Sequence, residues 1–264
     1  MKINSVDKAI TILNCFSLTK PVAGVGEISK LTGLNPSTVS RLLATLESRG
    51  VVEKVDGYGK YQLGYRTYLW GIISQERNNL ASLAKPIMEN LRDKFGEEVS
   101  LYILSDRHRV CLERVPSKHQ IARVGAVGEI YPLHAGASGR VLLAYLPEET
   151  RKAIIKSGLE KFTPVTLTDP AQLEATLSEI RRKGYAISKG EREPAAFSVV
   201  APVRNADNRV VASLCIAGPL FRLSQEQTET YTQAILQAAE QISEKLGFSL
   251  PSSEKTDRLD SVSR

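Results

Sequence analysis

The 264-residue sequence contains only three cysteines, Cys15, Cys111 and Cys215, and no long apolar run. Because the cysteines are far apart and odd in number, they indicate neither a disulfide framework nor a zinc motif, and we expect small buried apolar residues. No stretch approaches the roughly 18 consecutive apolar residues of a membrane-spanning helix. The first residues also lack the apolar centre of a secretion signal, so we expect a cytoplasmic protein that binds no membrane.

Histidine is equally scarce, and His108, His119 and His134 lack the spacing of metal ligands on one helix. The sequence has no G-x-S-x-G turn, no H-E-x-x-H helix and no G-x-G-x-x-G after a strand. His134 and Ser138 lie one helical turn apart, but the start of a helix explains that spacing without catalysis. We therefore expect no enzyme, no cofactor and no bound metal.

Positive charge is concentrated near the beginning of the chain. The net charge is +6, and residues 1–79 contribute +4 of it, with ten Lys or Arg against six Asp or Glu. A positive excess favours binding to nucleic-acid phosphates. The excess is modest, so its meaning depends on the motifs within the same segment.

Residues 36–48 predict a helix with one apolar face and one small polar face. The apolar face comprises Val39, Leu42, Leu43 and Leu46, at the spacing of a buried helical stripe. Asn35 suits the N-cap and Pro36 suits the first helical position. The candidate DNA-contacting residues on the polar side are Ser37, Thr38, Ser40, Arg41 and Thr45. Short hydroxyl side chains and one guanidinium fit a DNA major groove.

Two shorter helices and a hairpin surround this helix in the sequence. The first helix has Ser5 as its expected cap, and its expected inner residues are Val6, Ala9, Ile10, Leu13 and Phe16. The second has Val25, Ile28 and Leu31 inside and ends at Gly33. Alternating segments at 51–55 and 60–64 flank Asp56-Gly57, a hairpin signal, and we place Lys60 and Tyr61 on the surface of this wing.

Three helices followed by a basic hairpin predict a winged helix-turn-helix that binds double-stranded DNA. Two alternatives stay open at this point. The segment could be a helical subdomain with solvated Ser and Thr, or a module that binds another protein. The short polar face argues against the second alternative, because protein interfaces favour aromatic residues and Met.

The whole chain resembles the IclR family of transcriptional regulators. The resemblance rests on SVDKAITILNCF, GEISKLTGLNPSTVSRLLATLESRG and KYQLGYR, then on YPLHAGASGRVLLAYLP, RRKGYAISKGE, APVRN and VVASLCIAGP. It implies an N-terminal winged helix joined to a larger effector-binding domain, and operator binding as a dimer or a dimer of dimers. Pro36 and Ser40 stand where many relatives have a basic residue and a His or Tyr, so the operator sequence is not implied.

We divide the chain into a winged helix at 1–65, a linker helix at 66–80, an effector-binding domain at 81–249 and a disordered tail at 250–264. The helical pattern of residues 65–95 is broken near Asn78-Asn79. The aromatic residues Tyr68 and Trp70 of the linker are explained equally well by a subunit interface and by packing within one chain.

The second domain is expected to be α+β. Strand patterns occur at 98–106, 109–117, 121–127, 185–191, 197–205 and 210–218, and helical patterns occur at 135–146, 147–158, 169–184 and from Ser224 onward. Ser224 and Gln227 have the spacing of a capping box. The resemblance implies a GAF-like or profilin-like antiparallel sheet.

Small residues in the segment HAGASGRVLLA let backbone N–H groups face a ligand, as in an anion site. The alternative is that they only permit close packing of helix on sheet. The resemblance implies a pocket that contains Ala137, Ser138, Ser188, Ser198, Cys215 and Ala217, with Arg123 and Tyr131 near its mouth. Relatives that bind small oxo-acids tend to have Asp at the position of Ser188, Cys at that of Ser198, and Ser at those of Cys215 and Ala217. The identity of the ligand is therefore left open.

A guanidinium at the mouth of the pocket favours a carboxylate. We therefore expect a small organic acid as effector, such as a sugar acid or an aromatic acid, and a repressor of a catabolic operon. An activator that responds to a ligand other than an acid is the alternative, because winged helices serve both kinds of regulator.

Overall fold

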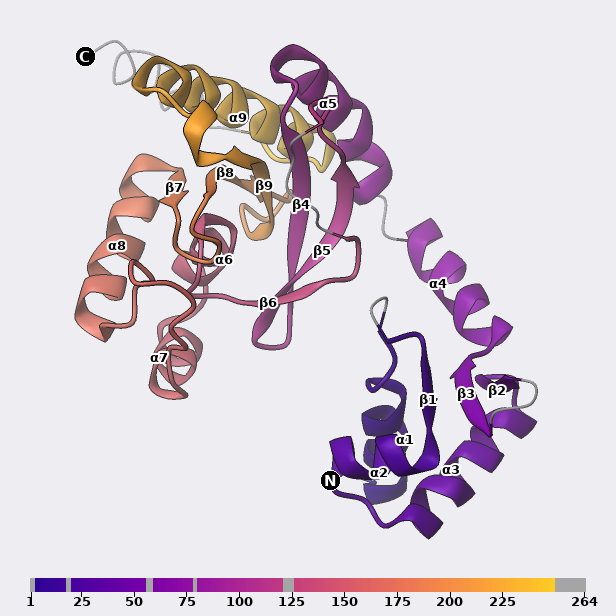
Figure 1. The fold of residues 1–264 in the computed structure, drawn as a ribbon. Coiled ribbons are helices and arrows are strands. Elements are labelled where there is room, and N and C mark those ends of the chain that lie inside the picture. Colours follow the sequence, from indigo (N-terminus) through magenta and orange to yellow (C-terminus); the bar gives the residue numbers. More distant parts are fainter. Residues whose placement is uncertain (1–2, 18–19, 56–58, 78–79, 121–125, 250–264) are drawn as a thin grey trace. The chain divides into compact units, whose positions relative to one another are not determined.

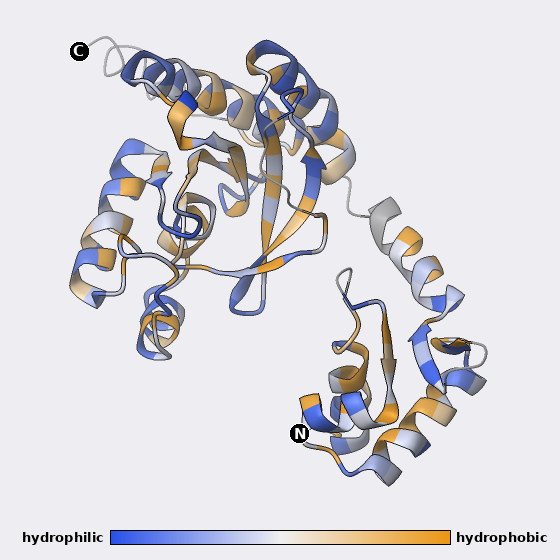
Figure 2. Ribbon diagram, viewed as in Figure 1, coloured by the Kyte–Doolittle hydropathy of each residue, from blue (hydrophilic) through white to orange (hydrophobic). Residues whose placement is uncertain are grey.

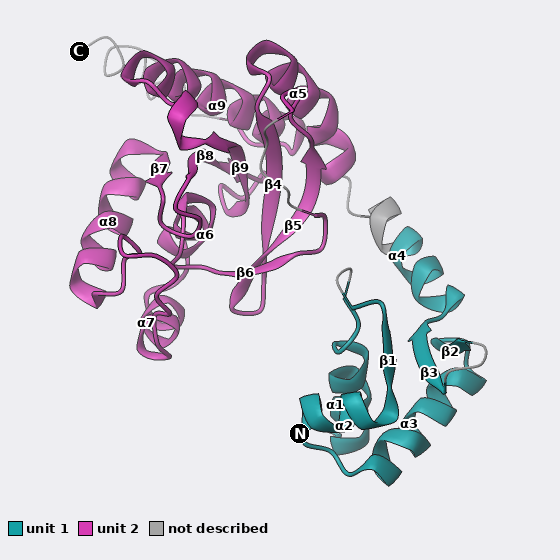
Figure 3. Ribbon diagram, in the orientation of Figure 1, with its two compact units in different colours: residues 1–79 teal, residues 80–264 magenta. Residues whose placement is uncertain are grey.

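The structure is a computed structural model that describes residues 3–17, 20–55, 59–77, 80–120 and 126–249 (Figure 1). The chain divides into two compact units, residues 1–79 and 80–264, which are described separately (Figure 3). The expectations that fall outside the described residues are the turn at Asp56-Gly57, the break at Asn78-Asn79, the pocket residue Arg123 and the tail at 250–264.

The first unit begins with three helices and a small antiparallel sheet, followed by a fourth helix. Its helices are α1 (Asn4–Leu13), α2 (Val25–Thr32), α3 (Pro36–Ser48) and α4 (Tyr65–Arg77). Its strands are β1 (Val22–Gly24), β2 (Val52–Val55) and β3 (Lys60–Leu63), in the order β1-β3-β2. This arrangement confirms the predicted winged helix-turn-helix. Strand β1 was not predicted, because three residues are too few for an alternating pattern.

Helix α3 forms as its sequence predicts. The Asn35 side chain accepts a hydrogen bond from the Ser37 backbone N–H over 3.0 Å, and Pro36 is the first helical residue. Val39 and Leu43 are fully buried in the core of the unit. Helix α2 ends at Gly33, whose φ of 69° lies in the left-handed region that favours glycine.

The inner faces predicted for α1 and α2 are partly wrong. Helix α1 begins at Asn4, and its cap, Ile3, makes no side-chain hydrogen bond. Ile12 is buried, whereas Val6 and Ile10 are exposed. Helix α1 carries apolar residues on two faces, so periodicity alone does not determine which face is covered. In α2, Leu31 is also exposed.

The second unit contains a six-stranded antiparallel sheet in the order β6-β5-β4-β9-β8-β7. The strands are β4 (Glu98–Ser105), β5 (His108–Val115), β6 (Ile130–Pro132), β7 (Ala186–Lys189), β8 (Ala196–Arg204) and β9 (Val210–Pro219). The helices are α5 (Leu80–Phe95), α6 (Ala137–Ala144), α7 (Glu148–Lys156), α8 (Pro170–Lys183) and α9 (Gln225–Lys245), with a short 3-10 helix at Leu220–Arg222. The predicted α+β class is confirmed.

Helices cover both faces of this sheet (Figure 1). On one face α5 and α9 pack against strand residues such as Leu101, Leu214 and Ile216. On the other face α6 packs on the central strands and α8 packs on α6. Figure 2 shows that α5, α8 and α9 carry hydrophilic residues along much of their length, as outer helices do. The central strands of the sheet are therefore covered on both faces.

Most of the predicted elements of the second unit are confirmed, with one correction. A third strand was expected at 121–127, but Ala126 and Val127 are not in a strand and residues 121–125 lie outside the described part. The edge strand is β6 instead, which pairs with β5. The caps at Asp169 of α8 and at Ser224 of α9 form as predicted. Among the described residues, no helix is long and apolar enough to cross a membrane.

Candidate DNA-binding surface and effector pocket

The outer face of α3 carries the short polar residues that the sequence predicts for DNA contact. Ser37, Ser40, Arg41 and Thr45 are exposed, and Thr38 is half-buried. The Thr45 hydroxyl donates a hydrogen bond to the Arg41 carbonyl over 2.9 Å, which leaves its oxygen able to accept from a DNA base or water. The long guanidinium of Arg41 extends from the middle of this face, where it can reach a base edge or a phosphate.

Tyr61 was predicted to lie on the surface of the wing, and this prediction is wrong. It is 7% exposed and belongs to the core of the first unit. Strand β3 is the middle strand, so its alternating side chains point to the helices or to solvent, and Tyr61 takes the inner side. The neighbouring Lys60 is exposed, in agreement with its predicted position.

Lys54, on the other strand of the wing, is tied to α3. Its ammonium lies 3.1 Å from a Glu47 carboxylate oxygen and 5.7 Å from the Tyr61 ring centroid. The hydrogen bond and charge of Glu47 raise the pKa of Lys54. Lys60 is therefore the better candidate for a phosphate contact on the wing, because Lys54 already has an acidic partner.

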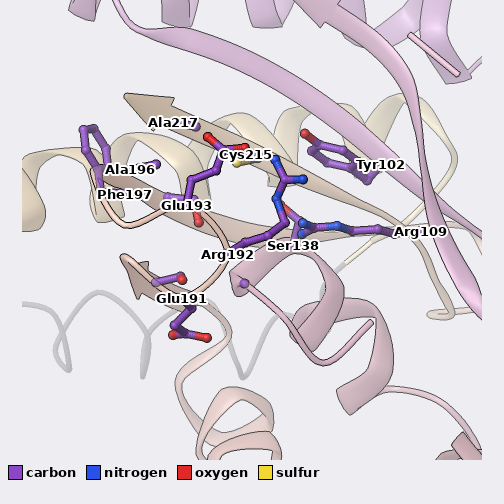
Figure 4. A pocket seen from close by; sticks show the side chains of 13 residues that line it. Tyr102, Arg109, Ser138, Glu191, Arg192, Glu193, Ala196, Phe197, Cys215 and Ala217 are labelled. Atoms are coloured by element: carbon purple, nitrogen blue, oxygen red, sulfur yellow. Dashed lines mark hydrogen bonds and ion pairs between the residues drawn. The ribbon is translucent and has the colours of Figure 1, made fainter. Parts of the chain in front are cut away.

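The second unit contains a cavity of about 40 Å³ where the first turn of α6 meets the sheet (Figure 4). Five of the predicted effector-binding residues line it: Ser138, Ser188, Ser198, Cys215 and Ala217. Their side chains come from α6, β7, β8 and β9 and give the cavity three hydroxyls and one thiol. Such a site combines apolar walls with a few hydrogen-bonding groups, as small-molecule sites do.

Ala137, which was predicted in the pocket, and Tyr131, which was predicted near its mouth, do not line the cavity. Ala137 is fully buried in the core beneath α6. Tyr131 packs beside the cavity, where its ring contacts the guanidiniums of Arg109 and Arg192. Arg123 lies outside the described residues. Tyr131 therefore contacts two arginines beside the cavity.

Sequence reasoning missed the two arginines of the cavity. Arg109 on β5 is only 4% exposed, and its guanidinium carbon lies 5.1 Å from the ring centroids of both Tyr102 and Tyr131. Arg192 comes from the turn between β7 and β8. One signal for Arg109 was available: it precedes Cys111 by two residues, so both occupy the same face of a strand whose inner residues are buried.

Glutamates accompany the arginines of the site. Arg192 forms an ion pair with Glu193. Arg140 of α6 forms an ion pair with Glu191 and donates a hydrogen bond to the Ile187 carbonyl over 3.0 Å. Burial, together with the charge of Arg109, lowers the pKa of Arg140 to about 10, so the side chain is still charged at neutral pH. Two of the arginines at or near the cavity are therefore ion-paired with glutamates.

The small residues before and within α6 permit close packing of this helix, the alternative that the sequence left open, and they also lie beside the cavity. Gly136 adopts a φ of 88° at the edge of the cavity, a conformation that favours glycine. At Gly139 a Cβ atom would lie 2.4 Å from the Leu133 carbonyl oxygen, so this position needs glycine for close packing. Ser138 lines the cavity between them.

Gly139→Ala is expected to lower the free energy of unfolding by about 1–3 kcal/mol, because the added methyl forces the backbone at Leu133 to shift. Urea unfolding followed by circular dichroism measures this loss. Gly26→Ala in α2 is the matched control, since its Cβ meets nothing within 4 Å and should be neutral or stabilising. Equal effects of the two substitutions would refute the packing role of Gly139.

The helix-turn-helix with its short polar face and the cavity of the second unit indicate a DNA-binding transcriptional regulator. Residues 5–56 match the IclR helix-turn-helix domain, and residues 74–244 match the domain described as bacterial transcriptional regulator IclR C-terminal. Because these matches cover most of the chain in the expected order, the chain belongs to the IclR family of transcriptional regulators.

Individual relatives agree over nearly their full length. The chain is 32% identical to the HTH-type transcriptional regulator KipR of Bacillus subtilis over 94% of this chain and 98% of that protein. It is 29% identical to the HTH-type transcriptional repressor AllR of Klebsiella pneumoniae, over 92% and 90% of the two chains. An IclR homologue from Microbacterium hydrocarbonoxydans, solved with 4-hydroxybenzoate, has a TM-score of 0.80 and 26% identity, covering 92% and 98%. These relatives are similar to this chain in both domains.

Proposed function

We propose that this regulator represses a catabolic operon and releases its operator when a small organic acid enters the pocket of the second unit. The observation that carries the proposal is Arg109, a buried arginine that lines that pocket. A guanidinium binds a carboxylate through two parallel hydrogen bonds. The relative solved with 4-hydroxybenzoate held an acid, and AllR is named a repressor, which supports both parts of the proposal.

We propose that α3 enters the major groove and that the wing lies along the phosphates. The bases would be read by the exposed residues Ser37, Ser40, Arg41 and Thr45, with Thr38 close to the backbone. The helix begins at an N-cap with no acidic residue in its first turn, so its N-terminus can approach a phosphate without repulsion. Binding to another protein is less well supported, because this face has no aromatic residue.

We propose that α4 pairs two subunits. The helix exposes six large apolar residues within the first unit: Tyr65, Tyr68, Leu69, Trp70, Ile72 and Ile73. Continuous apolar exposure of this kind marks an interface and is unusual on a monomer. The exposed Val6 and Ile10 of α1 add to the apolar surface of the same unit. Two paired subunits would present two α3 helices to two half-sites of an operator.

The acid-sensing part is tested by titrating the purified protein with 4-hydroxybenzoate, glyoxylate and a panel of short-chain acids in a calorimeter. Binding of at least one acid by the native protein, and its loss in Arg109→Gln, is the expected result. A native protein that binds no acid, or an Arg109→Gln protein that binds as well as the native one, would contradict the assignment.

Lys60→Ala is expected to weaken binding to all DNA sequences alike. It should also reduce the slope of log affinity against log salt by about 1 for each lysine–phosphate contact that is lost. Fluorescence anisotropy at several salt concentrations gives both quantities. Lys152→Ala, an exposed lysine of α7, serves as the control for a general change in charge. An unchanged salt slope in Lys60→Ala would mean that the wing does not contact DNA.

A further inference from the structure

We propose that the effector is a dicarboxylate, with one carboxylate bound by Arg109 and the other by Arg192. In this arrangement the second carboxylate takes the place that Glu193 occupies on Arg192. The inference rests on the proposed function, that the pocket senses an organic acid, and specifies its chemical class.

Arg109 provides a fixed inner binding position. Its guanidinium is held between the rings of Tyr102 and Tyr131, at 5.1 Å from each centroid. The side chain is almost fully buried, so its donors keep one orientation. A Cβ atom at Gly136 would lie 3.6 Å from Nη2 of Arg109, so the start of α6 lies directly against the guanidinium. A carboxylate here would receive charge-assisted hydrogen bonds beside a helix N-terminus.

Arg192 provides a second binding position for a carboxylate, next to the same tyrosine, Tyr131. Its guanidinium carbon lies 4.1 Å from the Tyr131 ring centroid, so Tyr131 contacts both arginines. Figure 4 shows both guanidiniums in the central part of the pocket, with Glu193 on one side and Tyr102 on the other. Two guanidiniums that share one small cavity match a ligand with two carboxylates better than a ligand with one.

Charge supports the same conclusion. Arg192 forms an ion pair with Glu193, and Arg140 forms one with Glu191. If the Glu193 carboxylate moves into solvent, Arg192 needs another anion in a poorly solvated site. The second carboxylate of a diacid supplies that anion, whereas a monocarboxylate bound by Arg109 does not.

Glu193 is the group most easily displaced. Its side chain is 42% exposed, compared with 20% for Arg192 and 12% for Glu191. An exposed carboxylate regains water when it leaves an ion pair, so the exchange costs little free energy. Glu191 is held differently, since its carboxylate pairs with the buried Arg140.

The size of the cavity indicates that side chains must move. Its volume of about 40 Å³ is far below the roughly 300–1,000 Å³ of typical small-molecule pockets. The start of the turn is fixed, because the hydroxyls of Thr163 and Thr166 donate to the carbonyls of Gly190 and Glu191 over 2.8 and 2.6 Å. The rearrangement is therefore confined to the tip of the turn, where Arg192 and Glu193 lie.

The experiment is calorimetric titration of the full-length protein with malonate, succinate, glutarate and adipate, each compared with the monocarboxylate of the same carbon number. At least one diacid is expected to bind about tenfold or more tightly than the monocarboxylate of the same carbon number. One additional charged hydrogen bond contributes an effect of this size. Arg192→Gln should remove that preference. Glu193→Gln should tighten diacid binding, because the competing carboxylate is gone.

Arg182→Gln, an exposed arginine of α8, is the control for loss of positive charge. Equal binding of monocarboxylates and diacids by the native protein, with no effect of Arg192→Gln, would overturn this inference and leave acid sensing intact. Binding of neither set would overturn acid sensing by this pocket as well. Weaker diacid binding in Glu193→Gln would show that Glu193 supports the ligand, which contradicts the proposed exchange.

Discussion

The double substitution Trp70→Glu and Ile73→Glu is expected to convert the protein to monomers and to weaken operator binding by roughly a thousandfold, to the level of non-specific binding. Both residues are at least half exposed on α4 within the first unit. In a two-fold symmetric dimer, each introduced glutamate faces the same residue or a neighbouring residue of the partner subunit. Four carboxylates would then lie in one apolar interface. A monomer contacts only one half-site and loses the contribution of the second.

Sedimentation velocity measures the oligomeric state, and fluorescence anisotropy on promoter DNA measures affinity. Ala175→Glu, at an exposed position of α8, is the control for added negative charge on a helix. Circular dichroism of the double variant should match the native spectrum, because neither side chain belongs to a core. If the variant keeps its native mass and affinity, α4 does not pair the subunits.

Arg41→Ala is the second substitution with a large expected effect. If Arg41 reads a base, each missing contact costs about 1–3 kcal/mol, and a dimer loses two such contacts. The loss should be confined to operators that carry the preferred base and should disappear at operators changed at that position. Anisotropy titrations on a set of single-base operator variants reveal this pattern.

Arg49→Ala is the matched control for Arg41→Ala, since Arg49 is the C-cap of the same helix, away from its N-terminal part. It should change affinity less and leave base preference intact. A uniform loss for Arg41→Ala across unrelated sequences would identify a phosphate contact in place of base reading.

The parts of the fold that the sequence predicted well are those with local causes. Helix α3 begins where Asn35 can cap it and Pro36 can start it, and both effects act within a few residues. The capping box of Ser224 and Gln227 fixes the start of α9 in the same way. Local hydrogen bonds depend little on the rest of the chain, so the sequence alone identifies them.

The errors occurred where distant contacts decide the outcome. Helix α1 has apolar residues on two faces, and the placement of α3 and the sheet determines that Ile12 is covered while Ile10 is not. Tyr61 was assigned to the wing surface because an exposed hairpin was expected, but the unpredicted strand β1 makes β3 a central strand. Its inner side chains then join the core.

The pocket was predicted only in part, because distant contacts also decide which residues meet there. Ser188 and Ser198 were located through resemblance, and they lie opposite each other on β7 and β8. Arg109 was missed, because its role depends on β5 lying next to β4 and on the start of α6 reaching the same end of the sheet. Arg192 was missed because a turn residue gains its position from the fold around it.

In a ligand-controlled repressor, DNA binding and ligand binding are coupled, and this coupling is reciprocal. An acid that weakens operator affinity by some factor must bind the DNA complex more weakly by that same factor. This equality holds whatever the structural route between the two units, so it tests the thermodynamic claim without assuming a pathway.

The most direct test is a fluorescence anisotropy titration of the purified protein on DNA from its own upstream region, at several salt concentrations and with each acid of the panel. We expect sequence-selective binding that falls steeply with salt and is weakened further by one acid, with a diacid more effective than its monocarboxylate partner. Binding to this DNA no tighter than to random DNA, or selective binding that no acid changes, would contradict the claim that the protein is a ligand-controlled repressor.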